Sequence, residues 1–415
     1  MIRLHKLKNK RIAILGAGGL GVCTALELAN RGYTVDVYEE NNAPVKKASY
    51  VQEGKIHLGL IYAMDRDFHT AKEMINGALH FISYLKRWVE INPEDIISTP
   101  FHYGVHTGSL MSPEEVSAHY QRCSDYFAEA RKHFKKDYLD LFESLEVSRL
   151  ANSQIGDIAN PEYMSAVFQT TEYAVEPRII SKKLTEAIDS HPNINLFLNT
   201  KVTAVSEQGN SLKVHFLRDS KEDSESYSEV INATWNGLLA IDKTMGIEPP
   251  QKWSHRYKFG NKIFIPLKAD DLPSLTIVQG PFGDTVNFKD RGLFMSWYPV
   301  GRTGWSEDYR APDWDSQYSE EERMEVFEKS LAKIALRIPK LSKLKFEPKD
   351  ISPVGGVIYA HGNKDVDSAE SKLHTRSEVG MRSFGNYHTV NTGKYTIIPL
   401  LAVTIANQIT GKSLN

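Results

Sequence analysis

The chain has 415 residues, of which 41% are hydrophobic and 25% charged, and its formal net charge is −2 at pH 7. This composition is typical of a globular protein with ample core-forming residues, and the near-neutral charge argues against a nucleic-acid-binding surface. Two cysteines imply no disulfide framework and fit a reducing compartment. The basic segment Met1 to Lys10 lacks the apolar stretch of a signal peptide, and the apolar run 397–409 is too short to span a bilayer. A cytoplasmic protein without a transmembrane segment is therefore expected.

A buried strand, a glycine turn, a helix and a second strand follow one another from Arg11 to Glu40. The turn carries the pattern Gly-x-Gly-x-x-Gly at Gly16, Gly18 and Gly21. Its glycines allow a tight turn, the close approach of a pyrophosphate and close packing of helix on strand. Glu39, at the end of the second strand, is placed to accept hydrogen bonds from the hydroxyls of an adenosine ribose. The stretch predicts a Rossmann-type dinucleotide site, which either NAD or FAD could use.

The rest of the chain predicts mixed helices and strands. Residues 41–64 lack clear periodicity, and a loop of that length in a compact domain is usually functional. Apolar spacing and capping boxes predict helices at 69–91, after Ser112, from Pro177 to Asp189, at 319–338 and before Gly411. Strands are predicted at 101–107, 167–174, 193–198, 201–207, 212–217 and 229–234, with a solvated turn at 219–226. Between 257 and 300, short aromatic-rich runs separated by Pro and Gly predict an antiparallel sheet.

Four separated pieces of the sequence match one family pattern. They are the unit Gly16 to Glu39, the stretch Gly54 to Tyr62, the strand end Val230 to Trp235, and Gly393 to Thr396. Together they resemble the FAD-dependent oxidoreductases of the D-amino-acid oxidase superfamily, which includes glycine and sarcosine oxidases, glycerol-3-phosphate dehydrogenases and L-2-hydroxyglutarate dehydrogenases. The resemblance covers nearly the whole chain and implies FAD as the cofactor.

The resemblance and the element pattern together predict an α/β fold of mixed α+β character. We expect a discontinuous Rossmann-type FAD-binding domain over residues 8–92, 160–250 and 350–415. An antiparallel-sheet substrate domain is expected to be inserted over residues 93–159 and 251–349.

The resemblance also implies which residues contact FAD, and no metal is expected. Because FAD is long, its flavin must meet chain segments distant from the first strand–helix–strand unit. Lys394, at the start of the last helix, would stabilise negative charge on the flavin as it is reduced. The predicted contacts are Gly16, Ala17, Gly18, Gly19, Leu20, Gly21, Glu39, Glu40, Lys47, Ser49, Gly54, His57, Val202, Ala233, Thr234, Trp235, Gly393, Lys394, Tyr395 and Thr396.

Three residues are predicted to serve catalysis, namely His57, Tyr62 and Arg302. A histidine with an ordinary pKa of about 6.5 suits proton transfer at neutral pH, and His57 could instead fix the flavin by a hydrogen bond. A substrate carboxylate would favour a bidentate arginine. Arg302, which follows the aromatic run 294–298, is our first choice among Arg256, Arg291, Arg302 and Arg382.

The stretch from His57 to Tyr62 is more similar to that of the hydroxyglutarate and glycerol-phosphate enzymes than to that of the amine oxidases. However, Ile61 stands where the glycerol-phosphate enzymes carry an arginine, and we expect no counterpart of their extra C-terminal domain. We therefore expect hydride removal from a CH–OH carbon of a small polar substrate, with a CH–NH donor (an amine or amino acid) as the alternative. An NAD-linked dehydrogenase and a non-catalytic flavin-binding module remain as hypotheses of other classes. The electron acceptor could be oxygen, a quinone or a carrier protein.

Overall fold

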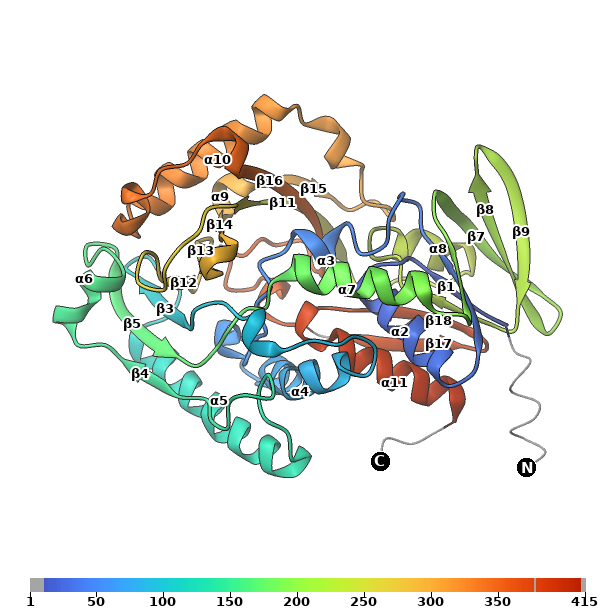
Figure 1. Ribbon diagram of the computed structural model, residues 1–415, viewed down its shortest axis with the longest axis horizontal. Helices are drawn as coiled ribbons and strands as arrows, with labels where there is room; N and C mark the ends of the chain where they lie inside the picture. Colours follow the sequence, from blue (N-terminus) through green and yellow to red (C-terminus); the bar gives the residue numbers. More distant parts are fainter. Residues whose placement is uncertain (1–10, 377, 412–415) are drawn as a thin grey trace.

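The computed structural model of the protein describes residues 11–376 and 378–411, so the basic segment Met1 to Lys10 lies outside the described residues. In the described part of the chain the strands form three sheets, with helices between and around them (Figure 1). The helices are α2 (Gly19–Asn30), α3 (Ala48–Val51), α4 (His69–Leu85), α5 (Pro113–Phe134), α6 (Ile155–Ile158), α7 (Pro177–Ser190), α8 (Leu238–Thr244), α9 (Tyr298–Gly301), α10 (Glu320–Ala335) and α11 (Ile398–Thr410).

A six-stranded sheet has the order β17-β18-β10-β1-β2-β6 and is parallel except for the β17–β18 pair. Central strand β1 lies between β2 and β10, and the glycine turn follows directly at its carboxyl end. Open parallel sheets bind their ligands at this edge. The strands are β1 (Arg11–Leu15), β2 (Thr34–Tyr38), β6 (Ile194–Phe197), β10 (Glu229–Asn232), β17 (Gly380–Phe384) and β18 (Tyr387–Asn391).

Both faces of this sheet are covered, and the alternation along β1 shows how. Ile12 and Ile14 belong to the large core beneath α2, α4, α7 and α11, whereas Ala13 and Leu15 pack on the opposite face. That face is covered by α8 and a three-stranded antiparallel sheet of β7 (Thr200–Gln208), β8 (Ser211–Arg218) and β9 (Lys221–Tyr227). The solvated turn predicted at 219–226 is therefore wrong, because β9 pairs with β8 along its full length while most of its polar side chains face solvent.

The third sheet, of nine strands, is antiparallel except where β12 pairs with β3. β16 pairs with β11 from Ile351 to His361, and α10 packs on the sheet through Phe327 and Ile334. β5 and β16 belong here, so the sheet extends beyond the ranges 93–159 and 251–349 predicted for the substrate domain. The strands are β3 (Phe101–His106), β4 (Val147–Arg149), β5 (Met164–Thr170), β11 (Trp253–Ile263), β12 (Ser274–Val278), β13 (Gly283–Asn287), β14 (Leu293–Trp297), β15 (Arg302–Ser306) and β16 (Ile351–His361).

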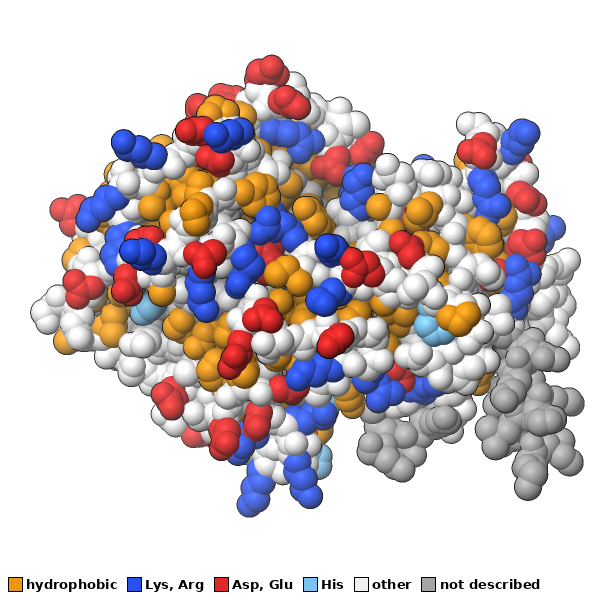
Figure 2. All heavy atoms as spheres, in the orientation of Figure 1, with side chains coloured by type: hydrophobic (Ala, Val, Ile, Leu, Met, Phe, Trp, Pro, Cys, Tyr) orange, Lys and Arg blue, Asp and Glu red, His pale blue; other side chains and the backbone are white. Residues whose placement is uncertain are grey.

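Acidic and basic side chains are interspersed over the face of the molecule that Figure 2 shows, in keeping with the small net charge. None of the helices in the described part of the chain combines the length and the apolar character that a membrane crossing requires.

A buried carboxylate holds the helices beneath the six-stranded sheet. Glu27 of α2 accepts hydrogen bonds from Arg31 (2.7 Å), Arg87 (2.7 Å) and Trp88 (3.0 Å), and its side chain is 1% exposed. Arg31 also donates to Asn407 of α11 at 2.8 Å. Burial alone would raise the pKa of Glu27, but these donors outweigh it and lower the pKa. Glu27 therefore fixes α2, and with it the glycine turn, against α11 and the chain after α4.

We expect Glu27→Gln to lower the free energy of unfolding by about 3 kcal/mol, because it leaves partly buried cations without their counter-charge. Glu325→Gln is the matched control, since Glu325 forms an exposed ion pair with Lys329 and should change stability by less than about 0.5 kcal/mol. Urea unfolding of both variants measures the difference. Equal stabilities would contradict the structural role of Glu27.

Candidate active site

A cavity of about 320 Å³ extends from the glycine turn to His57. Its wall is built by the turn after β1, the end of β2, the long segment from Lys46 to His57, β7, the end of β10, β11, β16 and the chain before α11. The cavity therefore lies where the parallel sheet and the nine-stranded sheet meet.

The glycines of the turn have distinct surroundings. Gly16 has φ of +95°, and a Cβ there would lie 2.8 Å from the carbonyl oxygen of Ala233. A Cβ on Gly21 would lie 2.0 Å from the carbonyl oxygen of Gly16, so this glycine allows α2 to pack against the turn. By contrast, a Cβ on Gly18 would meet nothing within 4 Å, although Gly18 lines the cavity. The turn thus leaves open space beside Gly18.

Glu39 stands at the end of β2 beside the turn. One carboxylate oxygen accepts the backbone N–H of Ala17 at 2.9 Å, and the other accepts the backbone N–H of Asn41 at 2.9 Å. Glu39 is 9% exposed and lines the cavity. Its carboxylate is held rigidly with lone pairs still available for a ligand hydroxyl.

Most of the residues predicted to contact FAD line this cavity. They are Gly16, Ala17, Gly18, Gly19, Leu20, Glu39, Glu40, Lys47, Ser49, His57, Val202, Ala233, Thr234, Trp235, Gly393, Lys394 and Tyr395.

Gly21, Gly54 and Thr396 lie behind the wall and support it. Gly54 has φ of +82° and packs against the carbonyl oxygen of Val175. The Thr396 hydroxyl accepts the backbone N–H of His57 at 3.0 Å and donates to the carbonyl oxygen of Lys55 at 3.3 Å.

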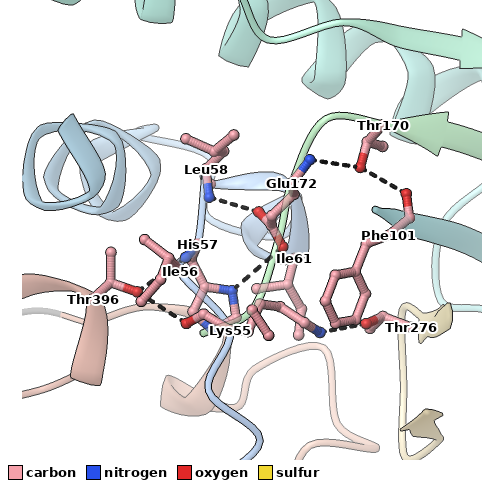
Figure 3. Close-up of polar contacts among 12 residues, drawn as sticks. Lys55, Ile56, His57, Leu58, Ile61, Phe101, Thr170, Glu172, Thr276 and Thr396 are labelled. Atoms are coloured by element: carbon pink, nitrogen blue, oxygen red, sulfur yellow. Dashed lines mark hydrogen bonds and ion pairs between the residues drawn. The ribbon is translucent and has the colours of Figure 1, made fainter. Parts of the chain in front are cut away.

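His57 lies between this threonine and Glu172 (Figure 3). The residue is 2% exposed, and its Nδ1 atom is 3.9 Å from a carboxylate oxygen of Glu172, with no hydrogen-bond partner among the described residues. Burial, and then Lys394, Lys55 and Arg376, lower the pKa of His57 well below its ordinary value of 6.5. The imidazole is therefore neutral at neutral pH, the form that accepts a proton.

Glu172 is itself completely buried and firmly held. Its carboxylate accepts the backbone N–H of Leu58 at 2.6 Å and the hydroxyl of Tyr103. Burial raises the pKa of Glu172, while Lys55 and these hydrogen bonds oppose the rise. At 3.9 Å the contact is electrostatic and not a hydrogen bond, but a negative charge on Glu172 favours the tautomer with its proton on Nδ1, in which Nε2 has the free lone pair.

Cations gather at the His57 end of the cavity, namely Lys55, Lys258, Arg376 and Lys394. Lys55 is 2% exposed, donates to the hydroxyl of Thr276 and lies 3.8 Å from Asp284. Lys258 donates to the Ser296 hydroxyl at 3.0 Å, which in turn donates to Asp284 at 2.5 Å.

Lys394 and Glu53 show how strongly these charges interact. Burial, and then Arg376, lower the pKa of Lys394 to about 8, while Glu53 opposes the change. Burial alone would raise the pKa of Glu53, but Lys394, Lys55 and Lys258 outweigh it and lower the pKa. Four cations thus face the side chains of Glu53, Asp284 and Glu172, and the surplus of positive charge suits an anionic ligand.

Tyr62 lies next to His57, with ring centroids 5.8 Å apart, and is 3% exposed. Burial raises the pKa of Tyr62 to about 12, and the neighbouring Arg376 opposes the rise. The Tyr62 hydroxyl and the Nε atom of Arg376 have no hydrogen-bond partner among the described residues. Arg376 also contacts the Tyr62 hydroxyl, so two donors lie side by side next to His57, and neither is bonded to a carboxylate of the described residues.

The four arginines considered from the sequence lie elsewhere, outside the residues that line the cavity. Arg302 pairs with Asp365 at 2.8 Å, Arg256 faces the same carboxylate at 3.5 Å, and Arg291 donates to the carbonyl oxygen of Ile97. Arg382 is on β17 and lies near the ring of Phe384. The sequence analysis missed Arg376, Lys258 and Glu172, because no motif marks them and only the fold brings them to His57.

The cavity suits an extended FAD molecule rather than a metal. A dinucleotide needs open space at the glycine turn, a carboxylate for its ribose and positive charge near the flavin, and Gly18, Glu39 and Lys394 supply these. Within residues 11–376 and 378–411, no three His, Cys, Asp or Glu side chains are gathered to hold a metal ion.

Solved structures with the same fold cover almost the whole chain. Glycine oxidase from Geobacillus kaustophilus has a TM-score of 0.66 at 14% identity and covers 98% of this chain and 96% of its own. The dithionite-reduced, FAD-bound L-alpha-glycerophosphate oxidase from Mycoplasma pneumoniae has a TM-score of 0.66 at 16% identity, with the same coverage. Iminodiacetate oxidase from Chelativorans sp. BNC1 has a TM-score of 0.62 at 14% identity, over 98% and 96% of the two chains.

The comparison with curated proteins finds no match. A family model described as FAD dependent oxidoreductase matches residues 11–346, which is most of the chain. The resemblance inferred from the four sequence motifs is thereby confirmed. The chain belongs to the FAD-dependent oxidoreductases of the D-amino-acid oxidase superfamily.

Proposed function

We propose that this oxidoreductase oxidises a CH–OH carbon of a small anionic substrate, with His57 accepting the hydroxyl proton. FAD, when bound, supplies the hydride acceptor. The observation that carries the proposal is the buried, neutral imidazole of His57, which lines the cavity and has Glu172 behind it.

An alcohol and an amine make different demands on such a site. An alcohol must lose its hydroxyl proton as the hydride leaves, so it requires a base in contact with the oxygen. A neutral amine can instead use its nitrogen lone pair as the hydride leaves. His57 with Nδ1 turned to Glu172 offers Nε2 as that base, which favours the alcohol.

The neighbouring donors Arg376 and Tyr62 support an anionic substrate group. Neither is bonded to a carboxylate of the described residues, so the guanidinium and the hydroxyl together would bind a carboxylate next to the reacting carbon. Arg376 thus takes the role that the sequence analysis gave to Arg302, which is paired with Asp365.

We further propose how this chain holds FAD. The Glu39 carboxylate would accept the ribose hydroxyls, the open side of Gly18 would admit the diphosphate, and Lys394 would lie by the flavin. Lys394 would then stabilise negative charge as the flavin is reduced.

The names of the solved relatives keep the amine alternative open. Glycine oxidase and iminodiacetate oxidase are named for amine substrates, whereas glycerophosphate oxidase is named for an alcohol. A non-catalytic flavin-binding module would contain FAD that no donor reduces. An anaerobic panel of 2-hydroxy acids, polyols, amino acids and N-methyl amines separates these cases.

Two glycine variants test the proposed FAD site. Gly18→Ala should leave the stability of the apoprotein almost unchanged, because its Cβ meets nothing, yet weaken FAD binding tenfold or more, about 1.4 kcal/mol. Gly21→Ala should destabilise the apoprotein by about 1–3 kcal/mol, since its Cβ overlaps the backbone of Gly16. Flavin fluorescence titration and apoprotein unfolding measure the two effects. Unweakened FAD binding by Gly18→Ala would show that the dinucleotide does not lie there.

His57→Gln should slow flavin reduction by about 100-fold or more at saturating donor, with the FAD content retained. Stopped-flow absorbance with the best donor of the panel measures the rate. His69→Gln is the control, because the side chain of His69 is 65% exposed and pairs with Glu73 outside the cavity wall. In the unaltered protein, the lowered pKa keeps His57 unprotonated, so the rate should fall only well below pH 6.5. Unchanged reduction kinetics in His57→Gln would show that His57 takes no part in flavin reduction.

Arg376→Met should raise the donor concentration for half-maximal reduction by about 10- to 100-fold. This factor corresponds to the loss of one charge-assisted contact, which contributes about 1.5–3 kcal/mol. The limiting rate should change less, and Arg376→Lys should recover part of the affinity. Arg302→Met is the comparison variant, since Arg302 lies outside the cavity wall. A larger effect of Arg302→Met would indicate that Arg302, the first choice from the sequence, binds the substrate carboxylate.

A further inference from the structure

Residues 307–317, between β15 and α10, cross from the nine-stranded sheet to the Rossmann sheet; we call them the bridging segment (Figure 1). On one side, Trp314 is buried in a cluster with Tyr257. On the other side, the backbone N–H of Ala311 donates to the carbonyl oxygen of Asn236 at 3.2 Å, and Tyr309 packs under Lys243 of α8 at 4.0 Å. The segment is therefore anchored at both ends.

The bridging segment places Arg310 on the cavity wall, close to the glycine turn. A guanidinium nitrogen of Arg310 lies 3.3 Å from the position that a Cβ on Gly237 would take, and the hydroxyl of Thr234 lies 3.3 Å from the same position. Thr234 in turn abuts the turn, because its Cα lies 3.0 Å from the position of a Cβ on Gly16. Thr234 thus lies near both Arg310 and the glycine turn.

The turn itself has limited capacity for phosphate oxygens. The backbone N–H of Ala17 is bonded to Glu39, and that of Gly19 to the hydroxyl of Ser49 at 3.0 Å. No lysine or arginine occurs within the turn, from Gly16 to Gly21. A diphosphate carries about two negative charges, so a cation from elsewhere would strengthen its binding at this turn.

Among the cations that line this part of the cavity, Arg310 makes the weakest contacts with other side chains. Lys47 is paired with Asp315 at 2.6 Å, and Lys46 donates to Asn42 at 2.7 Å. Arg310 stands 3.7 Å from Glu40, beyond hydrogen-bond distance, and its guanidinium donates no hydrogen bond within the described residues. Its planar fork matches the oxygens of a phosphate.

We propose that Arg310 binds the FAD diphosphate directly, so that the bridging segment retains the cofactor. The inference rests on the FAD dependence of the family and is independent of whether the donor is an alcohol or an amine. The Lys47–Asp315 pair ties the bridging segment to the cavity-lining segment that contains Lys47. Because both ends of this pair are partly exposed, at 44% and 31%, salt weakens this tie.

The test is the rate at which the holoenzyme releases FAD after dilution, followed by the rise in flavin fluorescence. Arg310→Gln should release FAD about tenfold faster or more, and Arg310→Lys should fall between it and the unaltered protein. Release from the unaltered protein should accelerate with salt, and Arg310→Gln should show a weaker salt dependence. Lys349→Gln, which removes an exposed pair with Glu347, is the control and should change release less than about twofold.

Asp315→Asn separates direct binding from the tie between the bridging segment and Lys47, because Asp315 does not line the cavity. If Arg310 binds the diphosphate, Asp315→Asn should accelerate FAD release much less than Arg310→Gln does. Equal acceleration by Asp315→Asn and Arg310→Gln would overturn the proposal, and so would release from Arg310→Gln at the unaltered rate. Unfolding of each apoprotein shows that the substitutions leave the fold intact.

Discussion

The burial of positive charge around His57 is the constraint on which the rest of the site depends. Lys55, Lys258, Arg376 and Lys394 come from four different segments and meet at one end of the cavity. Burial, and then Lys394, Lys55 and Arg376, make protonation of His57 unfavourable. These cations also provide the positive potential that an anionic substrate would meet.

This cluster exists only because two sheets meet at the cavity. Lys394 follows β18 of the Rossmann sheet, whereas Lys258 belongs to β11 of the nine-stranded sheet. Lys55 lies in the long segment between them and is held from the far side by Thr276 and Asp284. Neither sheet contains a complete site, and the side chains that neutralise one another come from both. The chemistry is therefore tied to the packing of the two halves, for which the bridging segment supplies another contact.

Local signals in the sequence are sufficient to predict several elements of the fold. The glycine turn, the capping boxes of α5 and α10 and the Gly411 end of α11 are each determined within a few residues, and the structure has all of them. The family resemblance, the α/β fold and FAD dependence followed from four such motifs. β9 was missed because one polar strand paired at the edge of a small sheet has no apolar alternation to reveal it. Arg376 was not among the arginines considered from the sequence, because no motif marks it and only tertiary contacts bring it to His57.

In the proposed reaction the neutral His57 accepts the hydroxyl proton of an alcohol, and the donor is not an amine. The most direct measurement is anaerobic titration of the flavin's visible absorption with matched donors that share a carbon skeleton, such as lactate with alanine and 2-hydroxyglutarate with glutamate. If His57 deprotonates an alcohol, a hydroxy acid bleaches the flavin and its amino counterpart bleaches it little or not at all. Bleaching by the amino acid alone would contradict this role and would show that the protein oxidises amines.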